Sequence, residues 1–546
     1  MMKQIMKTIN RQSIGSVLLL FAIAVNTSCT KNFDGYNTDP DKATKEQLTK
    51  DNLALGGYLT QMQHQVIPSL VNENNVDINN YQLIFSLMGD IYSGHQGTSN
   101  SYNNNGINNS TYSMIPSWYG AHFLNAYKNI MAPWYAVKER AEMSSPVTFA
   151  IAQTIKVMAM HRVTDTYGPL PYLQFKTGNI STPYDSQEAI YDSFFKDLDQ
   201  SITVLTDFIQ KNPGAKPLAN FDRIYSGDLS MWLKLTASLK LRLAMRTVNI
   251  SPEKSRRYAE EAITTGVMLS NGDNAFLRVD GVSSTNPLYA ISASYNDTRM
   301  GASIESFMKG YNDPRIGLLF NRVALPASST PDYHGIRSGS RFPGNSYAAF
   351  SSLNIAASTP IKWMSASEIY FLRAEGALRG WNMGGDAKGL YEQGIRMAFS
   401  QPMGGTNGTA GDATSYINDG TSTPAPYVDP INNSNSMAAT TQITIRWEGA
   451  DFDTNLERIL TQKWLALYPD GHEAWSEFRR TGYPKIFPIP ASNNMSGGLI
   501  STRLHVRRSP FPQNEYLNNN AAVLLGIQLL NGPDHGGTPL WWDTRR

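Results

Sequence analysis

Hydrophobic positions recur at helical spacing along most of the chain beyond residue 45. Apolar side chains return every three or four residues, as in a helix that buries one face. Strict alternation of apolar and polar residues, which marks a half-buried strand, is scarce. The pattern therefore predicts a mainly α-helical protein. The clearest amphipathic segments are 187–210, 229–248, 252–265, 366–379, 387–400 and 455–468.

The predicted helices come in pairs. Pro252 is well placed to start a helix directly after 229–248, and three glycines within 380–385 can end one helix before the next begins. We therefore expect helix–turn–helix units that carry long irregular loops. The spacing of small and aromatic residues resembles that of tetratricopeptide repeats, although the period is irregular. These residues are Ala374, Ala377, Tyr391 and Ala398.

Two long polar stretches interrupt the helical pattern. Residues 93–112 hold six Asn, four Ser, three Gly and two Tyr among twenty residues, with no charged side chain. This composition predicts a loop that takes no part in the core. Residues 401–442 are similar, with Tyr416 and Tyr427 set among Thr, Ser, Asn, Pro and Gly. Loops of this length within a domain are usually functional or disordered.

Composition and charge narrow the class of protein. The 546 residues are 41% hydrophobic and 17% charged, which is enough apolar material for a large core. Basic and acidic residues number 47 and 45, and no basic run is present to follow a phosphate backbone. We therefore expect no nucleic acid partner. Beyond residue 45, apolar runs end well before the ~20 residues that a membrane-spanning helix needs.

The N-terminus has the pattern of an export signal. Lys3, Lys7 and Arg11 precede a twelve-residue apolar run, 14–25, and the single cysteine of the chain follows at Cys29. A lone cysteine can form neither an internal disulfide nor a multi-cysteine metal site. Its position fits lipoprotein processing instead, in which the thiol receives a diacylglycerol. An ordinary secreted protein with a leftover thiol is the alternative.

This assignment divides the chain into three parts. Residues 1–28 are the expected signal peptide, and 29–44, rich in Asn and Asp, form an expected flexible tether. Residues 45–546 then form a single folded domain. Asn26 departs from the Leu that lipoprotein signals usually carry at this position.

Enzyme and cofactor signatures are largely missing. The chain contains no H-E-x-x-H, no G-x-S-x-G and no G-x-x-x-x-G-K-[ST], so we expect no catalytic residue, no cofactor and no metal. Asp451 and Asp453 imitate the start of a calcium loop, but Leu456 and Gln462 stand where that loop needs Gly and Glu. A glycosidase carboxylate pair is defined by distance in space, so a surface hydrolase stays an alternative.

Several blocks in a fixed order resemble one family of outer-membrane lipoproteins. The chain resembles the SusD/RagB family of nutrient-binding lipoproteins, within its SusD-like branch. The blocks are TDTYGPLPY at 164–172, DRIYSGDLSMWLKLTASLKLRLAMR at 222–246, EIYFLRAEGALRGW at 368–381, QKW at 462–464, WSEFRRTGYP at 475–484 and WWD at 541–543. One block alone is weak evidence, but their joint order is specific.

The resemblance implies a tetratricopeptide-like helical fold without catalysis. It also implies a location in the outer membrane, held by the lipid anchor and facing the cell exterior, and a SusC-type TonB-dependent transporter as partner. The motif residues themselves fall at helix-face spacings, so we predict that they pack in the core. They are Trp232, Leu235, Leu239, Leu243, Phe371, Ala374 and Trp464. For Arg479 and Arg480 we expect a role in satisfying carbonyls at helix ends.

Ligand-binding candidates come from two strips that suit an oligosaccharide. Aromatic rings offer a flat face to a sugar, while amides and guanidinium groups offer fixed donors and acceptors. The first strip supplies Tyr92, His95, Gln96, Tyr102, Asn104, Tyr112 and Trp118, and the second, 286–299, supplies Tyr289, Tyr295, Asn296 and Arg299. Each strip has an alternative role as a flexible loop facing the transporter. Peptide capture by the same kind of loop is the alternative function.

Overall fold

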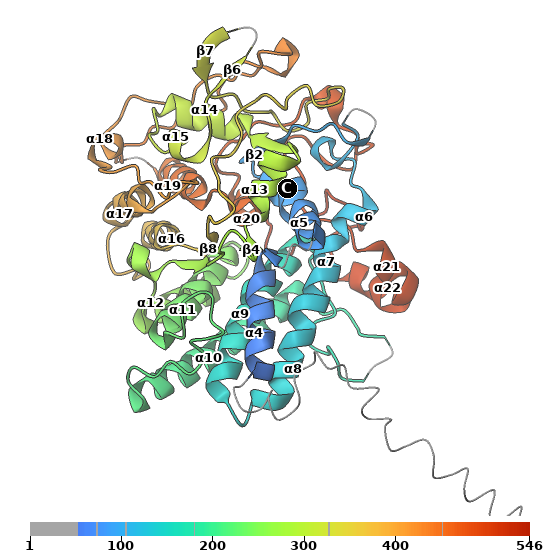
Figure 1. Cartoon of the computed structure of the whole chain (residues 1–546), viewed down its shortest axis with the longest axis vertical. Coiled ribbons are helices and arrows are strands. Elements are labelled where there is room, and N and C mark those ends of the chain that lie inside the picture. The colour runs from blue at the N-terminus through green and yellow to red at the C-terminus, as the bar shows by residue number, and fades with distance from the viewer. Residues whose placement is uncertain are drawn as a thin grey trace, which may run out of the picture. The chain divides into compact units, whose positions relative to one another are not determined.

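Helices dominate this computed structural model, which describes residues 53–71, 75–103, 106–178, 181–325, 328–449 and 451–545 (Figure 1). The mainly α-helical class predicted from periodicity is confirmed. Leu55–Arg546 forms one unit. Cys29, the signal peptide and the tether lie outside the described residues. None of the described helices has both the length and the apolar character that crossing a membrane requires.

The α-helices have the following bounds, given in chain order. They are α4 (Leu53–Val66), α5 (Asn75–Tyr81), α6 (Pro116–Tyr119), α7 (Ala121–Ala126), α8 (Ala132–Ala141), α9 (Pro146–Tyr167), α10 (Gln187–Lys211), α11 (Leu229–Arg246), α12 (Pro252–Thr265), α13 (Pro287–Tyr289), α14 (Ala302–Gly310), α15 (Ile316–Leu319), α16 (Ala366–Leu378), α17 (Ala387–Ser400), α18 (Thr414–Ile417), α19 (Phe452–Leu467), α20 (Gly471–Thr481), α21 (Gln513–Asn518) and α22 (Asn520–Gln528). Three π-helical segments are η1 (Gln82–Asp90), η4 (Tyr127–Met131) and η6 (Ala290–Ser294), and short 3₁₀ turns are η3 (Asn109–Thr111), η5 (Asn271–Asp273), η7 (Asn433–Asn435) and η8 (Ala491–Asn493).

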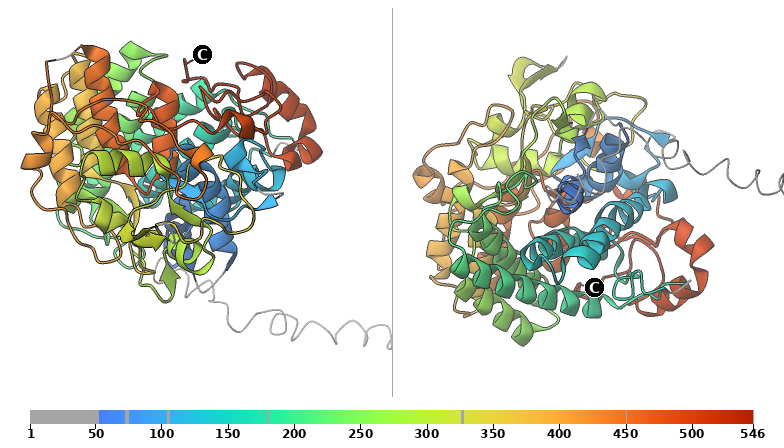
Figure 2. Two further views of the ribbon diagram at one scale, coloured as in Figure 1. Left: turned by 90° about the horizontal axis from the view of Figure 1, so that it is seen from above. Right: turned by 60° about the horizontal axis from the view of Figure 1, so that its bottom comes forward.

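The predicted helix pairs are present. α11 packs on α12 and α16 packs on α17, and α9 packs on α10 in the same way (Figures 1 and 2). Local sequence sets their ends: the Asp228 carboxylate caps the first turn of α11, and Asp386 caps α17. Ala259 of α12 is completely buried, as close helix contact requires. Helix-end chemistry and periodicity thus account for the repeat units.

Strands are short and few among the described residues. They are β1 (Leu70–Val71), β2 (Gln96–Thr98), β3 (Ala275–Leu277), β4 (Ser284–Thr285), β5 (Thr298–Met300), β6 (Val323–Leu325), β7 (Ser328–Asp332) and β8 (Ile361–Met364). They pair antiparallel as β1–β4, β2–β5, β3–β8 and β6–β7. Three of these pairs join segments at least 80 residues apart, so they tie the loops to one another rather than forming a layer of their own.

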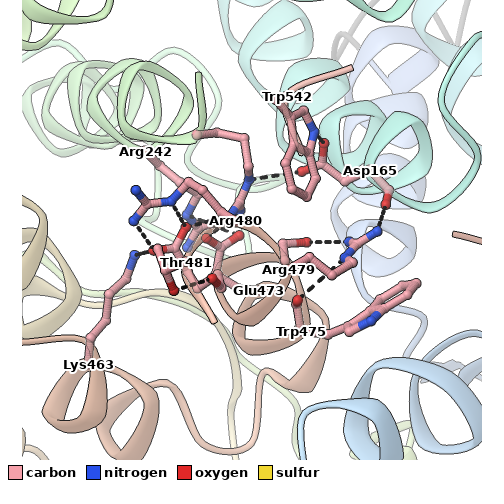
Figure 3. A network of polar contacts seen from close by, with 12 residues as sticks. Asp165, Arg242, Lys463, Glu473, Trp475, Arg479, Arg480, Thr481 and Trp542 are labelled. Atoms are coloured by element: carbon pink, nitrogen blue, oxygen red, sulfur yellow. Dashed lines mark hydrogen bonds and ion pairs between the residues drawn. The ribbon is translucent and has the colours of Figure 1, made fainter. Parts of the chain in front are cut away.

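Residues of the motif blocks meet in a buried network of charges (Figure 3). Arg246 donates to Asp165 at 3.2 Å, to Glu473 at 2.6 Å and to Glu477 at 2.5 Å, and its side chain is fully buried. Trp542 donates its indole N–H to Asp165 at 2.7 Å. Residues from four separated blocks therefore share one interior site.

The predicted core residues are confirmed. Trp232, Leu235, Leu239, Leu243, Phe371, Ala374 and Trp464 are each at most 2% exposed. Arg479 also behaves as expected, since it donates to the carbonyl of Asp165 in the last turn of α9 at 2.5 Å. Arg480 differs, because its guanidinium pairs with Glu375 at 2.6 Å and with Glu477 at 2.7 Å instead of with carbonyls.

The expectation that residues 93–112 stay out of the interior is wrong. Ser93, His95, Asn108 and Asn109 have no exposed surface. In this segment side chains form hydrogen bonds with backbone groups that a helix or sheet would otherwise pair with each other. The Asn109 side chain, for example, donates to the carbonyl of Leu87 at 3.0 Å and accepts from the amide of Ile115. A polar segment can be buried when each polar group finds a partner within the protein.

Candidate functional site

The two candidate strips lie side by side in the fold. β2 pairs with β5, and the ladder places Gln96 opposite Met300 and Thr98 opposite Thr298. The pairing continues beyond β2, because the amide of Ser99 donates to the carbonyl of Asp297 at 3.1 Å. Segments almost 200 residues apart in sequence therefore lie side by side.

Asp297 organises the polar part of this surface. Its carboxylate accepts from Gln82 Nε2 at 2.7 Å and from Asn100 Nδ2 at 2.9 Å. Gln82 also donates to the hydroxyl of Tyr102 at 2.9 Å. Burial, and next the charge of Asp297, raise the pKa of Tyr102, so its hydroxyl keeps its proton. Three side chains, those of Gln82, Asn100 and Tyr102, are thereby held in fixed positions around one carboxylate.

Aromatic rings line the same surface. Tyr102 and the half-buried Trp118 of α6 meet edge to face, with ring centroids 5.3 Å apart and an interplanar angle of 78°. Tyr295, at the end of η6, is 37% exposed and the following Asn296 is also exposed. We call Tyr102, Trp118, Tyr295 and Asn296 the aromatic patch. Tyr289 is 40% exposed and lies at the other end of the short helical segment that leads to Tyr295.

Four other candidates lie in the interior. Tyr92 and Tyr112 are at most 5% exposed, and Tyr92 packs against Trp475 with centroids 5.2 Å apart. The imidazole of His95 has no exposed surface and lies 3.0 Å from the carbonyl of Trp464; burial lowers its pKa to about 3. Gln96 is equally buried and accepts from Thr298 at 2.8 Å. These side chains therefore belong to the packed interior rather than to the exposed surface.

Arg299 supports the patch. It is 3% exposed, and its guanidinium donates to the carbonyls of Ala348, Ser292 and Thr298. Its second Nη donates to the side chain of Asn296 at 2.8 Å, and Asn296 itself has a left-handed backbone with φ of 57°. Arg299 thus fixes the turn that presents Asn296. Asn104 lies outside the described residues.

The second polar loop does not add aromatic rings to the surface. Tyr416 is 7% exposed, and its hydroxyl donates to Asp313 or Gln462, both 3.2 Å away. Tyr427 is 2% exposed and donates to the carbonyl of Gly335 at 2.9 Å. Both rings therefore belong to the packing of the loop against the helices.

The structure adds residues that sequence reasoning missed. Gln82 and Asn100 hold Asp297, and all three side chains border the aromatic patch. Asn100 and Asp297 lie within the two strips. Gln82 stands at the start of the mainly apolar segment η1, and only its hydrogen bonds to Asp297 and Tyr102 show that it belongs to the site. No group of three His, Cys, Asp or Glu side chains suited to a metal occurs in the part of the chain that the structure describes.

Comparison with known proteins shows the family. The profile of the SusD-like family, described as SusD and RagB outer membrane lipoproteins, matches residues 35–543. The chain belongs to this family, whose members are binding proteins rather than enzymes. No curated protein sequence matches the chain at a significant level.

Solved structures of similar proteins agree. A chitin-binding SusD homologue from Flavobacterium johnsoniae is 38% identical with a TM-score of 0.84, and the match covers 90% of this chain and 99% of that one. A SusD homologue from Bacteroides uniformis is 38% identical with a TM-score of 0.81, again covering 90% and 99%. One from Bacteroides vulgatus is 31% identical with a TM-score of 0.84, covering 92% and 99%.

Proposed function

We propose that this protein binds oligosaccharides at the aromatic patch and delivers them to a SusC-type TonB-dependent transporter. The observation that carries the proposal is the patch itself: two contacting rings, a further exposed tyrosine and an exposed amide, with Tyr102 held by the Asp297 network and Asn296 by Arg299. The protein performs no catalysis in this process. It acts at the outer face of the outer membrane, held there by lipid on Cys29.

The chemistry of the patch suits a sugar. A pyranose ring has an apolar face that packs on an aromatic ring, and its hydroxyls need fixed donors and acceptors. Tyr102 and Asn296 are already held by neighbours, so little side-chain entropy is lost when a ligand binds. Because the patch is open, an internal segment of a longer glycan can lie across it.

The relatives suggest which sugar to test first. The Flavobacterium johnsoniae protein is described as chitin-binding, and a further structural neighbour at 25% identity carries the same description. Oligomers of N-acetylglucosamine are therefore the first ligands to measure, followed by a broad glycan array.

The test measures affinity and folding on the same variants. Tyr102→Ala, Trp118→Ala and Tyr295→Ala should each weaken binding of the recognised glycan by about 1 kcal/mol or more, by analogy with aromatic pair energies. Tyr295→Ala should leave the melting temperature nearly unchanged, because its ring is 37% exposed. The matched control is Phe452→Ala, which removes a 40% exposed ring from α19 and should leave glycan affinity unchanged.

Other outcomes identify the alternatives. Binding on a peptide library but on no glycan would make the protein a peptide receptor. Shortened products after incubation with the bound glycan would make it a hydrolase. If all three patch variants bind the glycan as the wild type does, the patch is not the site.

The transporter is tested by co-purification. Mild solubilisation of membranes that contain both proteins should yield a complex of this chain with a SusC-type barrel. The tether between Cys29 and the folded domain supports association, because it raises the local concentration of the two partners. Migration as a lone monomer beside a demonstrably present transporter would contradict this part of the proposal.

A further inference from the structure

A partly open cavity has a lining that includes none of the residues of the aromatic patch. It has a volume of about 80 Å³, room for roughly six waters. Its wall is mainly apolar and includes Phe85, Phe276, Leu288, Leu319 and Ile361. Apolar walls with a few polar groups at fixed points are typical of small-molecule sites.

Three deeply buried side chains that line this cavity leave polar ends without a partner. Tyr81 is 4% exposed, Gln401 is 7% exposed and Tyr468 is 9% exposed. Neither tyrosine hydroxyl, nor the Gln401 amide, makes a hydrogen bond to any residue that the structure describes. The polar atoms at these ends keep some accessible surface, so they are available to pair with a molecule in the cavity.

The wall of the cavity also carries a buried ammonium, that of Lys362, whose pKa burial lowers more than the nearby carboxylates of Asp470 and Glu368 raise it. Lys362 is 7% exposed, and its ammonium donates to the carbonyls of Ala466 at 2.8 Å and Tyr468 at 2.6 Å. An ammonium has three N–H groups, so one is left over. Among the described residues Lys362 takes part in no ion pair, and burial lowers its pKa to about 8.

The charges around Lys362 are balanced without it. Asp470, which also lines the cavity, is held by Arg162 through two hydrogen bonds of 2.8 Å. Arg242 pairs with Glu368 at 2.6 Å. Arg315 pairs with Asp313, also at 2.6 Å. Each of these guanidinium groups has its own carboxylate, so the cation left to attract an anion is Lys362.

We propose that this cavity binds a small monocarboxylate with an apolar body. The carboxylate accepts from the free N–H of Lys362 and from the hydroxyls of Tyr81 and Tyr468, while the body packs on Phe85 and Leu288. Charge-assisted hydrogen bonds to a buried lysine favour the anion over its neutral amide. This site is separate from the aromatic patch and does not depend on glycan binding.

The test uses two probes that differ only in charge. 4-Fluorophenylacetate and 4-fluorophenylacetamide are titrated into the purified folded domain, and binding is followed by the ¹⁹F line width of each probe. The acid should bind at least tenfold more tightly than the amide. Binding of neither probe, or equal binding of both, would overturn the proposal.

Variants locate the binding and separate it from folding. Tyr81→Phe and Tyr468→Phe remove one hydroxyl each and keep the ring, so they should fold normally and weaken the acid severalfold. Lys362→Met should abolish the preference for the acid over the amide. Tyr391→Phe is the matched control, since its buried hydroxyl donates to Ile445 far from this cavity.

The remaining comparison distinguishes this site from the glycan site. Tyr295→Ala should bind the acid as the wild type does. If the tyrosine variants leave binding of the acid unchanged, the cavity is not its site, even if Lys362→Met fails to fold. If the wild-type protein binds the acid but no glycan, only the proposal for the aromatic patch fails. If it binds a glycan but not the acid, only the proposal for the cavity fails.

Discussion

Arg246 shows how much a single buried side chain can hold together. Its guanidinium contacts Asp165 of α9 and both Glu473 and Glu477 of α20, and burial alone would disfavour its charge. The three carboxylates outweigh burial and raise its pKa, so it stays charged. Removing one partner from such a network leaves buried charge uncompensated, which costs far more than an exposed pair is worth.

We therefore expect Arg246→Met to lower the free energy of unfolding by about 3 to 5 kcal/mol. Arg256→Met is the control, because Arg256 pairs with Glu260 at a half-exposed position and should cost less than about 1 kcal/mol. Chemical denaturation of both variants measures the difference. Equal stability of the two variants would show that the network contributes little.

Helix ends carry a second class of prediction. Asp451 caps α19 by accepting from the amide of Thr454 at 3.0 Å, which explains why an acidic residue stands there. Asp451→Ala should cost about 1 kcal/mol of stability, whereas Asp451→Asn should be nearly neutral because Asn also caps. Thermal melts with and without a calcium chelator provide the check. A fall in the wild-type melting temperature on chelation would assign the residue to a metal instead.

Acid sensitivity belongs to the molecule as a whole. Each of its eight histidines has a pKa below the ordinary value, chiefly because burial disfavours the charged ring. The values fall to about 4 for His64 and to about 3 for His95 and His122. Below pH ~6.5 the histidines of the unfolded chain become protonated, whereas those of the folded chain stay neutral. Acid therefore favours unfolding.

Stability should therefore be greatest above pH ~6.5 and fall steadily towards pH 4. Asp90 and Glu305 work in the opposite direction, since burial raises the pKa of each, to about 7 for Glu305. The pKa values of Asp77, Asp165 and Asp185 are raised as well, but these five carboxyls are fewer than the eight histidines. Urea unfolding between pH 8 and pH 5 tests the sign: a midpoint that rises on acidification would contradict it.

Membrane attachment is the other property of the complete chain. Cys29→Ala should release the protein from the membrane fraction, because two or more acyl chains are needed for stable anchoring and no other lipid attachment is expected. Fractionation of cells that lack the transporter is the measurement. Protease treatment of intact cells then reports whether the domain faces the exterior. A mutant that still pellets with outer membranes would show that the anchor is elsewhere.

The sequence by itself determined the helices, their pairing and the family. Periodicity and end signals act over fewer than twenty residues, so segments such as 252–265 are readable without knowing the rest of the fold. The motif blocks were also correctly placed in the core, because their spacing follows one helix face. Hydrophobic periodicity and helix-end signals depend only on residues that are close together in the chain.

Only the tertiary structure decided which polar residues are exposed. His95 and Tyr102 lie seven positions apart in the same polar loop, yet one is buried beneath Trp464 and the other borders the surface. The difference arises from the pairing of β2 with β5, a contact between segments about 200 residues apart. The cavity around Lys362 has the same origin, since its walls come from segments that are spread along the chain from Ile67 to Asp470. Burial is set by long-range contacts, and local composition does not encode them.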